Sequence, residues 1–351
     1  MSEARIFKRR VMRLLNAVFG IVLLVWLVHR LGLANLMQDV SRLGWGIALV
    51  VALGGIAHVA KALAWRLAFP SDENSVAFLH FFKLRLASEA IGQLGVLGQA
   101  FGEGLRVSAL GPDLPIASRL SSVAIDRGLF VITGAMVVVV GLVTAPFSLN
   151  LAQGWRLYAR VFAVTLIVLL LALVFAIQKR WPILSGSARL GQRLSYCQAW
   201  LVKRDHLIMS IEDRLFSFHR DSPRAFWASL GLNLLTHIAS LSEIYVVLLL
   251  MGFNIGIVGS LIFEALTKLV NVVGLLNPGN VGTYEGGNVL IARMFGLGSD
   301  TGLVLAVARR IRAIFWAGIG SVCLLTLNRS RYLSQDDTSG EAERLRIIVP
   351  I

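Results

Sequence analysis

The sequence predicts an all-α polytopic membrane protein with about six full spans, two re-entrant helical hairpins and an inverted-topology repeat. Three observations support this prediction. The mean hydropathy is +0.72 and only 15% of the residues are charged, whereas soluble chains average about 25%. Several apolar runs are long enough to cross about 30 Å of hydrocarbon as helices. Two charged, glycine-rich segments interrupt these runs at related places.

The predicted full spans are six apolar stretches: Val11–Leu31, Trp45–Phe69, Val123–Pro146, Leu157–Ile177, Ala225–Met251 and Gly302–Leu327. A core helix of a soluble protein is shorter and amphipathic, so a soluble fold does not account for so many of them. The first stretch follows a basic N-terminus, as in a signal peptide, but it is long and no small-x-small cleavage site follows it. We therefore expect it to be retained as the first helix.

Two further segments are apolar in places but unsuited to face lipid. Val76–Leu110 contains acidic and basic side chains and five glycines. In Ile257–Phe295, an apolar limb runs into Pro278, Gly279 and Gly282. Proline and clustered glycine break a helix, and irregular backbone at membrane depth is tolerated only beside protein or water. Each segment is therefore predicted to form a re-entrant hairpin.

The bias of Lys and Arg among the short loops orients the spans. The basic N-terminus and the connector 178–224 are predicted to be cytoplasmic, and so is the C-terminus. The order span, span, hairpin, span occurs in residues 11–146 and recurs, with the opposite orientation, in residues 157–328. This is the layout of inverted repeats, whose substrate site lies at the repeat interface.

Residues 1–333 are predicted to form a single membrane domain. Within it, the connector 178–224 is expected to be an amphipathic helical segment along the membrane surface. Residues 334–351 are short and polar, and they are expected to be a disordered tail.

The composition excludes several classes of function. The net charge of +14 could suggest nucleic acid, but the basic residues flank apolar runs, as the positive-inside rule and anionic lipids predict. Cys197 and Cys323 are far apart and indicate neither a disulfide nor a metal site. His-Glu-x-x-His, Gly-x-Ser-x-Gly and P-loop motifs are missing from the sequence. We therefore expect no enzyme activity, no cofactor, no metal and no nucleic-acid partner.

Charged side chains at membrane depth are costly, so each is a candidate for function. Glu103 and Arg106 lie three residues apart on one helical face. They could line a cavity that meets a lipid head group, or they could form an ion pair that joins two helices. Gly98 and Gly102, four apart, would let another backbone approach closely. Arg127 is a candidate partner for a hairpin carboxylate.

Three arginines, Arg309, Arg310 and Arg312, lie in the last apolar run. Guanidinium groups bind phosphate in a forked geometry, so one hypothesis is that they hold a lipid phosphate, with Glu285 and Glu103 as counter-charges. The alternative is that this helix sits less deep and the arginines reach the surface.

Glu285 could pair with a cation, carry a proton or cap a broken helix. Glu264 and Lys268, four apart, are expected to pair on one helix. His58 with Lys61 and His237 with Glu243 are weaker candidates for function, and we expect them to make contacts between helices.

Three segments carry a family resemblance: Ser88 to Arg106 with Gly102-Glu103, Pro278-Gly279-x-x-Gly282-x-x-Glu285, and Ala308-Arg309-Arg310-Ile311-Arg312. They resemble the Gly-Glu-x-x-Arg segment, the Pro-Gly-x-x-Gly-x-x-Glu signature and the basic last helix of one flippase-like membrane family. That family contains the transmembrane region of lysylphosphatidylglycerol synthases. The likeness is closest to the branch associated with hopanoid biosynthesis. One departure is that Gly92 and Val96 stand where the family usually has an Asn and a Pro.

The resemblance implies a lipid translocase in the bacterial inner membrane that handles an amphipathic lipid of the phospholipid or hopanoid type. Bifunctional members carry a soluble transferase domain, which the chain to Ile351 lacks, so aminoacyl transfer is not expected. Two alternatives are a non-transporting membrane partner of a lipid-synthesis complex and a membrane-embedded enzyme acting on lipid head groups. The expected partners are membrane lipids, anionic or amphipathic, and lipid-biosynthesis proteins. The predicted substrate-binding residues are Glu103, Arg106, Arg127, Glu285, Arg309, Arg310 and Arg312.

Overall fold

A computed structural model describes most of the chain, and its described part is helical without strands. The described residues are 41, 43–69, 76–93, 96–111, 114–149, 153–191, 202, 204–274, 280 and 282–348. The predicted first span Val11–Leu31 lies outside them, and so do Pro278 and Gly279 of the predicted second break. The all-α polytopic class is confirmed.

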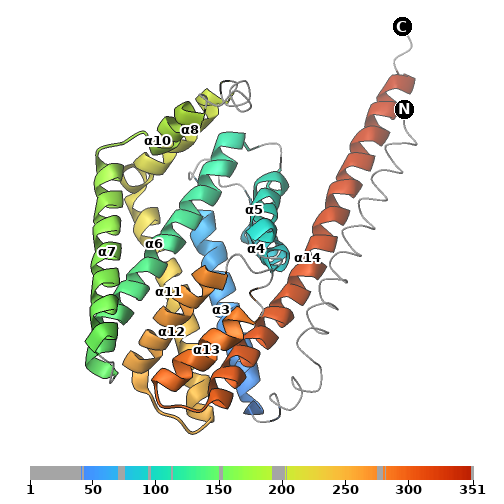
Figure 1. Cartoon of the computed structure of the whole chain (residues 1–351). Coiled ribbons are helices and arrows are strands. Elements are labelled where there is room, and N and C mark those ends of the chain that lie inside the picture. The colour runs from blue at the N-terminus through green and yellow to red at the C-terminus, as the bar shows by residue number, and fades with distance from the viewer. Residues whose placement is uncertain are drawn as a thin grey trace.

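Two sets of four helices form the body of the molecule (Figure 1). The first set is α3 (Gly46–Leu67), α4 (Phe78–Gly92), α5 (Val96–Ala109) and α6 (Ile116–Ser148). The second set is α11 (Pro223–Leu250), α12 (Gly256–Val273), α13 (Thr283–Met294) and α14 (Ser299–Ile348). Between the sets lie α7 (Gln153–Gln178), α8 (Ile183–Gly191) and α10 (Asp205–Asp221).

Six helices among the described residues are long and apolar enough to cross a membrane: α3, α6, α7, α11, α12 and α14. Five of them coincide with predicted spans. The sixth, α12, was expected to be a hairpin limb, yet its 18 residues reach about 27 Å at 1.5 Å per residue. By contrast, α4, α5 and α13 have 15, 14 and 12 residues, or about 18–23 Å, and are too short to cross about 30 Å. Re-entry of the hairpins into the membrane stays a prediction.

The packing of the two sets is reciprocal. Helix α3 packs on α11, its counterpart in the second set. Helix α4 packs on α14, and its counterpart α12 packs on α6, the counterpart of α14. Replacing each helix by its counterpart also converts the packing of α3 on α14 into that of α11 on α6. It likewise converts the packing of α5 on α6 into that of α13 on α14. This pattern is what two related halves would produce if the first limb of each hairpin packed on the last helix of the other half and the second limb on that of its own half.

Two glycines allow close approaches between α14 and α4 and between α6 and α12. A Cβ on Gly320 of α14 would collide with the backbone oxygen of Leu86 in α4. A Cβ on Gly141 of α6 would collide with the Cβ of Ala265 in α12. Small residues let membrane helices come close enough for van der Waals contact along their backbones. Each of these two contacts therefore joins one set to the other at a glycine.

The described part of the connector contains the helices α8 and α10, and its place along the membrane surface stays a prediction. Glu212 of α10 accepts hydrogen bonds from the backbone N–H of Leu184 (2.7 Å) and the hydroxyl of Ser185 (2.5 Å), which join α10 to the start of α8. Arg214 donates to the hydroxyl of Ser118 on α6 at 2.7 Å. These bonds fix the connector at one end of the body (Figure 1).

The C-terminal segment differs from expectation. Helix α14 continues as far as Ile348, so residues 334–348 are helical where a disordered tail was predicted. Glu, Ala, Leu and Arg, all strong helix formers, make up residues 341–346, and the long apolar helix that precedes them supplies the nucleus. Helix α14 leaves the body and extends beyond it (Figure 1).

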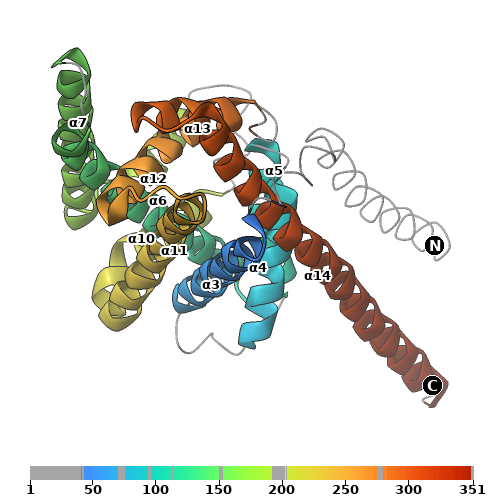
Figure 2. The same ribbon diagram turned by 90° about the horizontal axis from the view of Figure 1, so that it is seen from below.

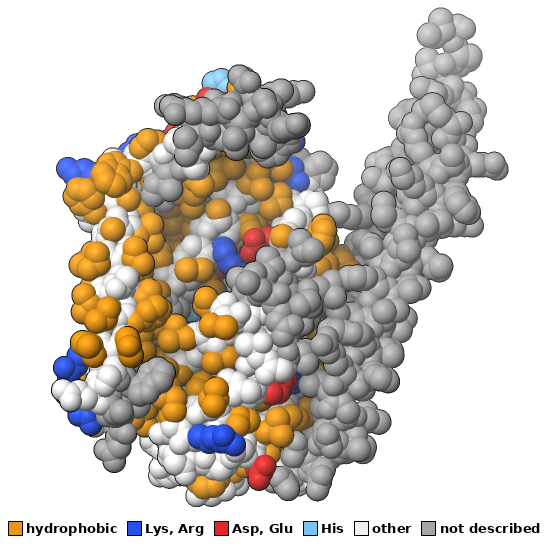
Figure 3. All heavy atoms as spheres, in the orientation of Figure 1, with side chains coloured by type: hydrophobic (Ala, Val, Ile, Leu, Met, Phe, Trp, Pro, Cys, Tyr) orange, Lys and Arg blue, Asp and Glu red, His pale blue; other side chains and the backbone are white. Residues whose placement is uncertain are grey.

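The outer surface is largely apolar. Helix α7 lies at the edge of the molecule (Figure 2), packs on α6, and exposes large side chains such as Leu157, Val168 and Leu171. Figure 3 shows hydrophobic side chains over one face, with basic and acidic side chains together where that face is hollowed. This distribution is typical of a helix bundle that faces lipid and keeps its charges inside.

Replacing Gly320 or Gly141 by Leu should lower the free energy of unfolding by about 1–3 kcal/mol, because the added side chain meets atoms that cannot move aside. Gly318→Leu is the matched control, since a Cβ at Gly318 has nothing within 4 Å among the described residues. Thermal unfolding midpoints of the detergent-solubilised proteins check this. Equal midpoints for Gly320→Leu and Gly318→Leu would contradict the close approach of α14 and α4.

Candidate functional site

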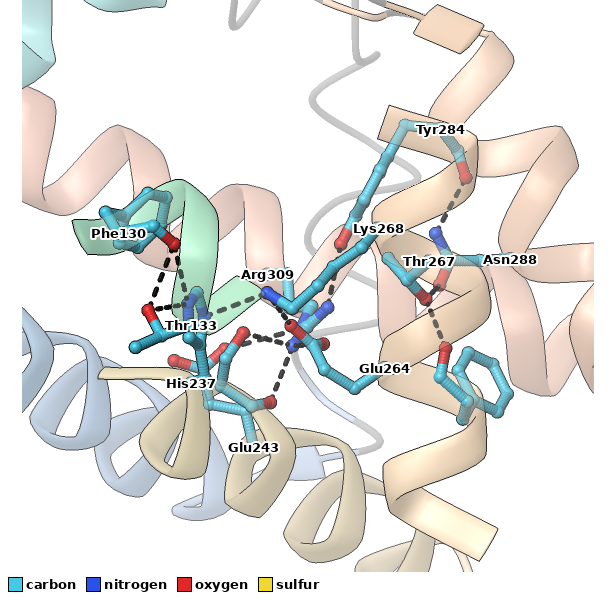
Figure 4. A network of polar contacts seen from close by, with 12 residues as sticks. Phe130, Thr133, His237, Glu243, Glu264, Thr267, Lys268, Tyr284, Asn288 and Arg309 are labelled. Atoms are coloured by element: carbon cyan, nitrogen blue, oxygen red, sulfur yellow. Dashed lines mark hydrogen bonds and ion pairs between the residues drawn. The ribbon is translucent and has the colours of Figure 1, made fainter. Parts of the chain in front are cut away.

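Arg309 of α14 lies at the centre of a buried network that joins the second set of helices (Figure 4). Its guanidinium is 2.7 Å from Glu264 of α12 and 3.3 Å from Glu243 of α11. It also donates to the backbone oxygen (2.6 Å) and the hydroxyl (2.9 Å) of Ser240. Three helices therefore converge on one guanidinium, and its charge is met by two carboxylates.

Glu264 extends this network to the first set. Lys268, one turn later on α12, is 3.0 Å from Glu264 and 3.0 Å from Nδ1 of His237. The ammonium can only donate, so Nδ1 accepts and Nε2 carries the ring proton. Nε2 then donates to the hydroxyl of Thr133 (3.1 Å) or the backbone oxygen of Phe130 (3.3 Å) on α6 (Figure 4). The predicted Glu264–Lys268 pair is confirmed, and it belongs to a longer chain.

The other two arginines of α14 point to different partners. Arg312 pairs with Glu243, the same carboxylate that Arg309 uses. Arg310 pairs with Glu285 and donates to the backbone oxygen of Asn280 at 3.2 Å. The hypothesis that Glu285 and Glu103 neutralise all three arginines is therefore wrong for Arg309 and Arg312. Their counter-charges come from α11 and α12, the helices packed beside them.

Glu285 has two of the three roles considered for it. It pairs with Arg310, and it accepts a hydrogen bond from the backbone N–H of Gly282 at 2.7 Å, which caps the N-terminus of α13. Gly282 has a φ of +83°, a conformation that L side chains rarely adopt. The carboxylate therefore fixes the start of α13 to α14.

The first hairpin holds a second charged cluster. Arg106 of α5 is fully buried and 2.6 Å from Asp126 of α6, which also receives Arg85 of α4 at 3.3 Å. The Arg106 guanidinium lies 4.0 Å from the centroid of the Trp65 ring. The predicted pairing of Glu103 with Arg106 is therefore wrong. Asp126 on the neighbouring helix reaches the Arg106 guanidinium, because α5 turns that face toward α6.

Glu103 instead pairs with Arg127 at 3.3 Å, as expected for a partner of a hairpin carboxylate. Arg127 also donates to the side-chain oxygen of Gln99 at 2.7 Å. Both charged side chains are more than a third exposed, so they can reach a ligand. Gly102 lets α5 approach α4, since a Cβ there would lie 2.5 Å from the backbone oxygen of Ser88. Gly98, one turn earlier, is buried.

Two cavities lie among these groups. The large cavity, about 390 Å³, is lined mostly by the first set of helices and by the break before α13. Its charged and amide side chains are Lys61, Arg85, Glu89, Gln93, Gln99, Glu103, Arg106, Arg127, Asn271 and Asn280. The small cavity, about 120 Å³, is lined by three helices of each set: α3, α4 and α6, and α11, α12 and α14. Lys61, Glu89, Gln93 and Phe130 line both cavities.

The described charges around the cavities do not balance. Six cations line them, Lys61, Arg85, Arg106, Arg127, Lys268 and Arg312, against two carboxylates, Glu89 and Glu103. Asp126, Glu243 and Glu264 pair with lining cations, and the last two also pair with Arg309. Seven described cations therefore face five carboxylates, an excess of two positive charges when the histidines are neutral.

Several residues of the site were not among the substrate-binding residues predicted from the sequence. Lys61, Glu89, Glu243 and Lys268 line the cavities or neutralise lining groups, yet none was chosen as substrate-binding. Their signal was present, because each is a charged residue inside or beside an apolar run. Of the chosen residues, the structure brings Glu103, Arg106 and Arg127 to the large cavity and Arg312 to the small one. Arg309, Arg310 and Glu285 lie behind these lining groups.

Comparison with known proteins places this arrangement in a family. A model of the lysylphosphatidylglycerol synthase TM region matches residues 13–320, which include every residue that lines the two cavities. A search of curated proteins finds no match. The match does not single out the hopanoid-associated branch, which stays a prediction. The chain is thus a multi-pass membrane protein linked to lipid handling, and it belongs to the family of the lysylphosphatidylglycerol synthase transmembrane region.

Proposed function

We propose that the protein moves an anionic, phosphate-bearing lipid across the membrane, with the head group in the large cavity and the acyl chains in the bilayer. The observation that carries this proposal is the excess of two positive charges among the described side chains around the cavities. Uncompensated charge at membrane depth is costly. An anionic ligand would remove that cost and would gain charge-assisted hydrogen bonds.

The chemistry of the large cavity suits a phosphate ester. Arg127 has a partly exposed side chain, and the guanidinium N–H groups that Glu103 and Gln99 do not use can bind phosphate oxygens. Lys61 adds an ammonium from α3. The amides of Gln93 and Asn271 can donate to or accept from the remaining oxygens and hydroxyls of a head group. The open, lipid-exposed outer surface of the bundle would hold the acyl chains.

The reciprocal packing of the two helix sets supports a transport cycle. In inverted-repeat transporters the site lies between the repeats, and rocking of one repeat against the other alternates its access. Here α3 and α11 pack against each other, and the first limb of each hairpin, α4 or α12, packs on the last helix of the other set. We propose that the two sets are inverted across the membrane, with re-entrant hairpins, and that they rock about the α3–α11 contact.

Arg127→Gln should slow translocation of phosphatidylglycerol at least about tenfold, because a charged hydrogen bond to phosphate is worth about 1.5–3 kcal/mol. The assay measures movement of a fluorescent phosphatidylglycerol between the leaflets of reconstituted vesicles. Arg293→Gln is the matched control, since Arg293 is exposed and bonds Ser299 of α14, away from both cavities. Equal rates for Arg127→Gln and the wild-type protein would refute the assigned site.

Glu103→Gln should act in the opposite direction on binding. Removing this carboxylate raises the excess of positive charge around the cavities and frees Arg127 for the ligand. Affinity for phosphatidylglycerol should therefore rise about two- to fivefold, which corresponds to the free energy of a half-exposed ion pair. Affinity for phosphatidylcholine, whose head group has no net charge, is the internal control. A loss of affinity for both lipids would show that the Glu103–Arg127 pair only holds two helices together.

A further inference from the structure

Three cations and one carboxylate, Glu89, line the small cavity, and the carboxylates that pair with two of these cations lie behind them. The side chains of Lys268 and Arg312 are 19% and 25% exposed, whereas their partners Glu264 and Glu243 are 3% and 0% exposed. Lys61 lines the same cavity from α3. Three cations from three helices therefore line one cavity against a single lining carboxylate.

A buried imidazole also lines this cavity, with its ring against Trp316. His58 lines the small cavity, is 9% exposed, and its Nδ1 has no hydrogen-bond partner among the described residues. Buried polar atoms are almost always paired with protein, water or ligand. An unpaired nitrogen beside three cations points to a ligand or water that donates to it, such as a protonated phosphate oxygen. The cavity has room for this, since about 10–15 Å³ already accommodates one water molecule.

The two cavities meet at Phe130. Its ring lies 4.8 Å from the Lys61 ammonium, 6.0 Å from the Arg127 guanidinium and 4.7 Å from the His237 ring centroid. Arg127 belongs to the large cavity and His237 to the small one, while Lys61 lines both. A head group that leaves Arg127 can therefore stay in contact with Lys61 until it reaches Lys268 and Arg312.

We propose that the small cavity is a second phosphate subsite, formed by Lys61, Lys268 and Arg312 between the two helix sets, into which the head group passes from the large cavity. This proposal rests on the proposed function, because it assigns the passage of the same head group to a second station. The large cavity would select the lipid, and the small cavity would hold its phosphate while the two sets rock.

The test uses two single-cysteine reporters in full-length protein carrying Cys197→Ser and Cys323→Ser. Ala313→Cys reports on the small cavity, and Gly92→Cys reports on the large one, where an added Cβ has ordinary space. Each is reconstituted into phosphatidylcholine vesicles and labelled with a small thiol reagent. Labelling rates are compared after adding phosphatidylglycerol to the bilayer or inorganic phosphate to the buffer.

Phosphatidylglycerol should slow labelling at both reporters at least about fivefold. Lys268→Met should abolish the protection at Ala313→Cys and leave the protection at Gly92→Cys unchanged. Arg312→Met is tested in parallel and should have the same effect, which covers the case in which Lys268→Met folds poorly.

Protection at Gly92→Cys alone overturns the second subsite and leaves the proposed function standing. Protection at Ala313→Cys alone supports the subsite and overturns the large cavity as the entry site. Protection of Ala313→Cys by inorganic phosphate but not by the lipid, or no protection at either reporter, overturns the head-group subsite.

Discussion

Arg309 is buried between Glu243 and Glu264, and the arrangement of the second helix set depends on this one contact. Moving an isolated charge into a low-dielectric interior costs far more than a folded protein can spare. The guanidinium therefore requires carboxylates from two helices, and those helices must lie where its fork can reach both. Breaking such a buried pair costs about 3–5 kcal/mol, so α11, α12 and α14 are held in one register. The chain of bonds from Glu264 through Lys268 to His237 carries that constraint across to the first set.

The same constraint explains why the interior is a candidate binding site and not merely a set of ion pairs. Most carboxylates near the cavities are engaged by more than one cation: Asp126 by Arg85 and Arg106, Glu243 by Arg309 and Arg312. A protein built only for stability would match these charges or replace them with apolar side chains, which is often neutral or stabilising. The excess of cations among the described side chains around the cavities costs stability unless an anion joins them, which is the pattern expected of a functional site.

Much of the fold follows from the sequence, because hydrocarbon thickness fixes the length of a span and lipid excludes unpaired backbone. Helix α12 was assigned to a hairpin because the break after it dominates the pattern, although its length alone was sufficient for a span. The site was only partly predictable. A charged residue in an apolar run is visible in the sequence, but the partner of Arg106 is decided by which face α5 turns toward α6. The role of Glu243 likewise depends on the packing of α11 against α14, which no local spacing encodes.

We propose that an anionic phospholipid head group neutralises the cationic interior. Native mass spectrometry of the protein purified in mild detergent can show this, because the bound lipid is identified by its own mass. Phospholipids with net negative charge should remain bound, in preference to zwitterionic lipids that are more abundant in the same extract. Retention of zwitterionic or uncharged lipids in proportion to their abundance would contradict it.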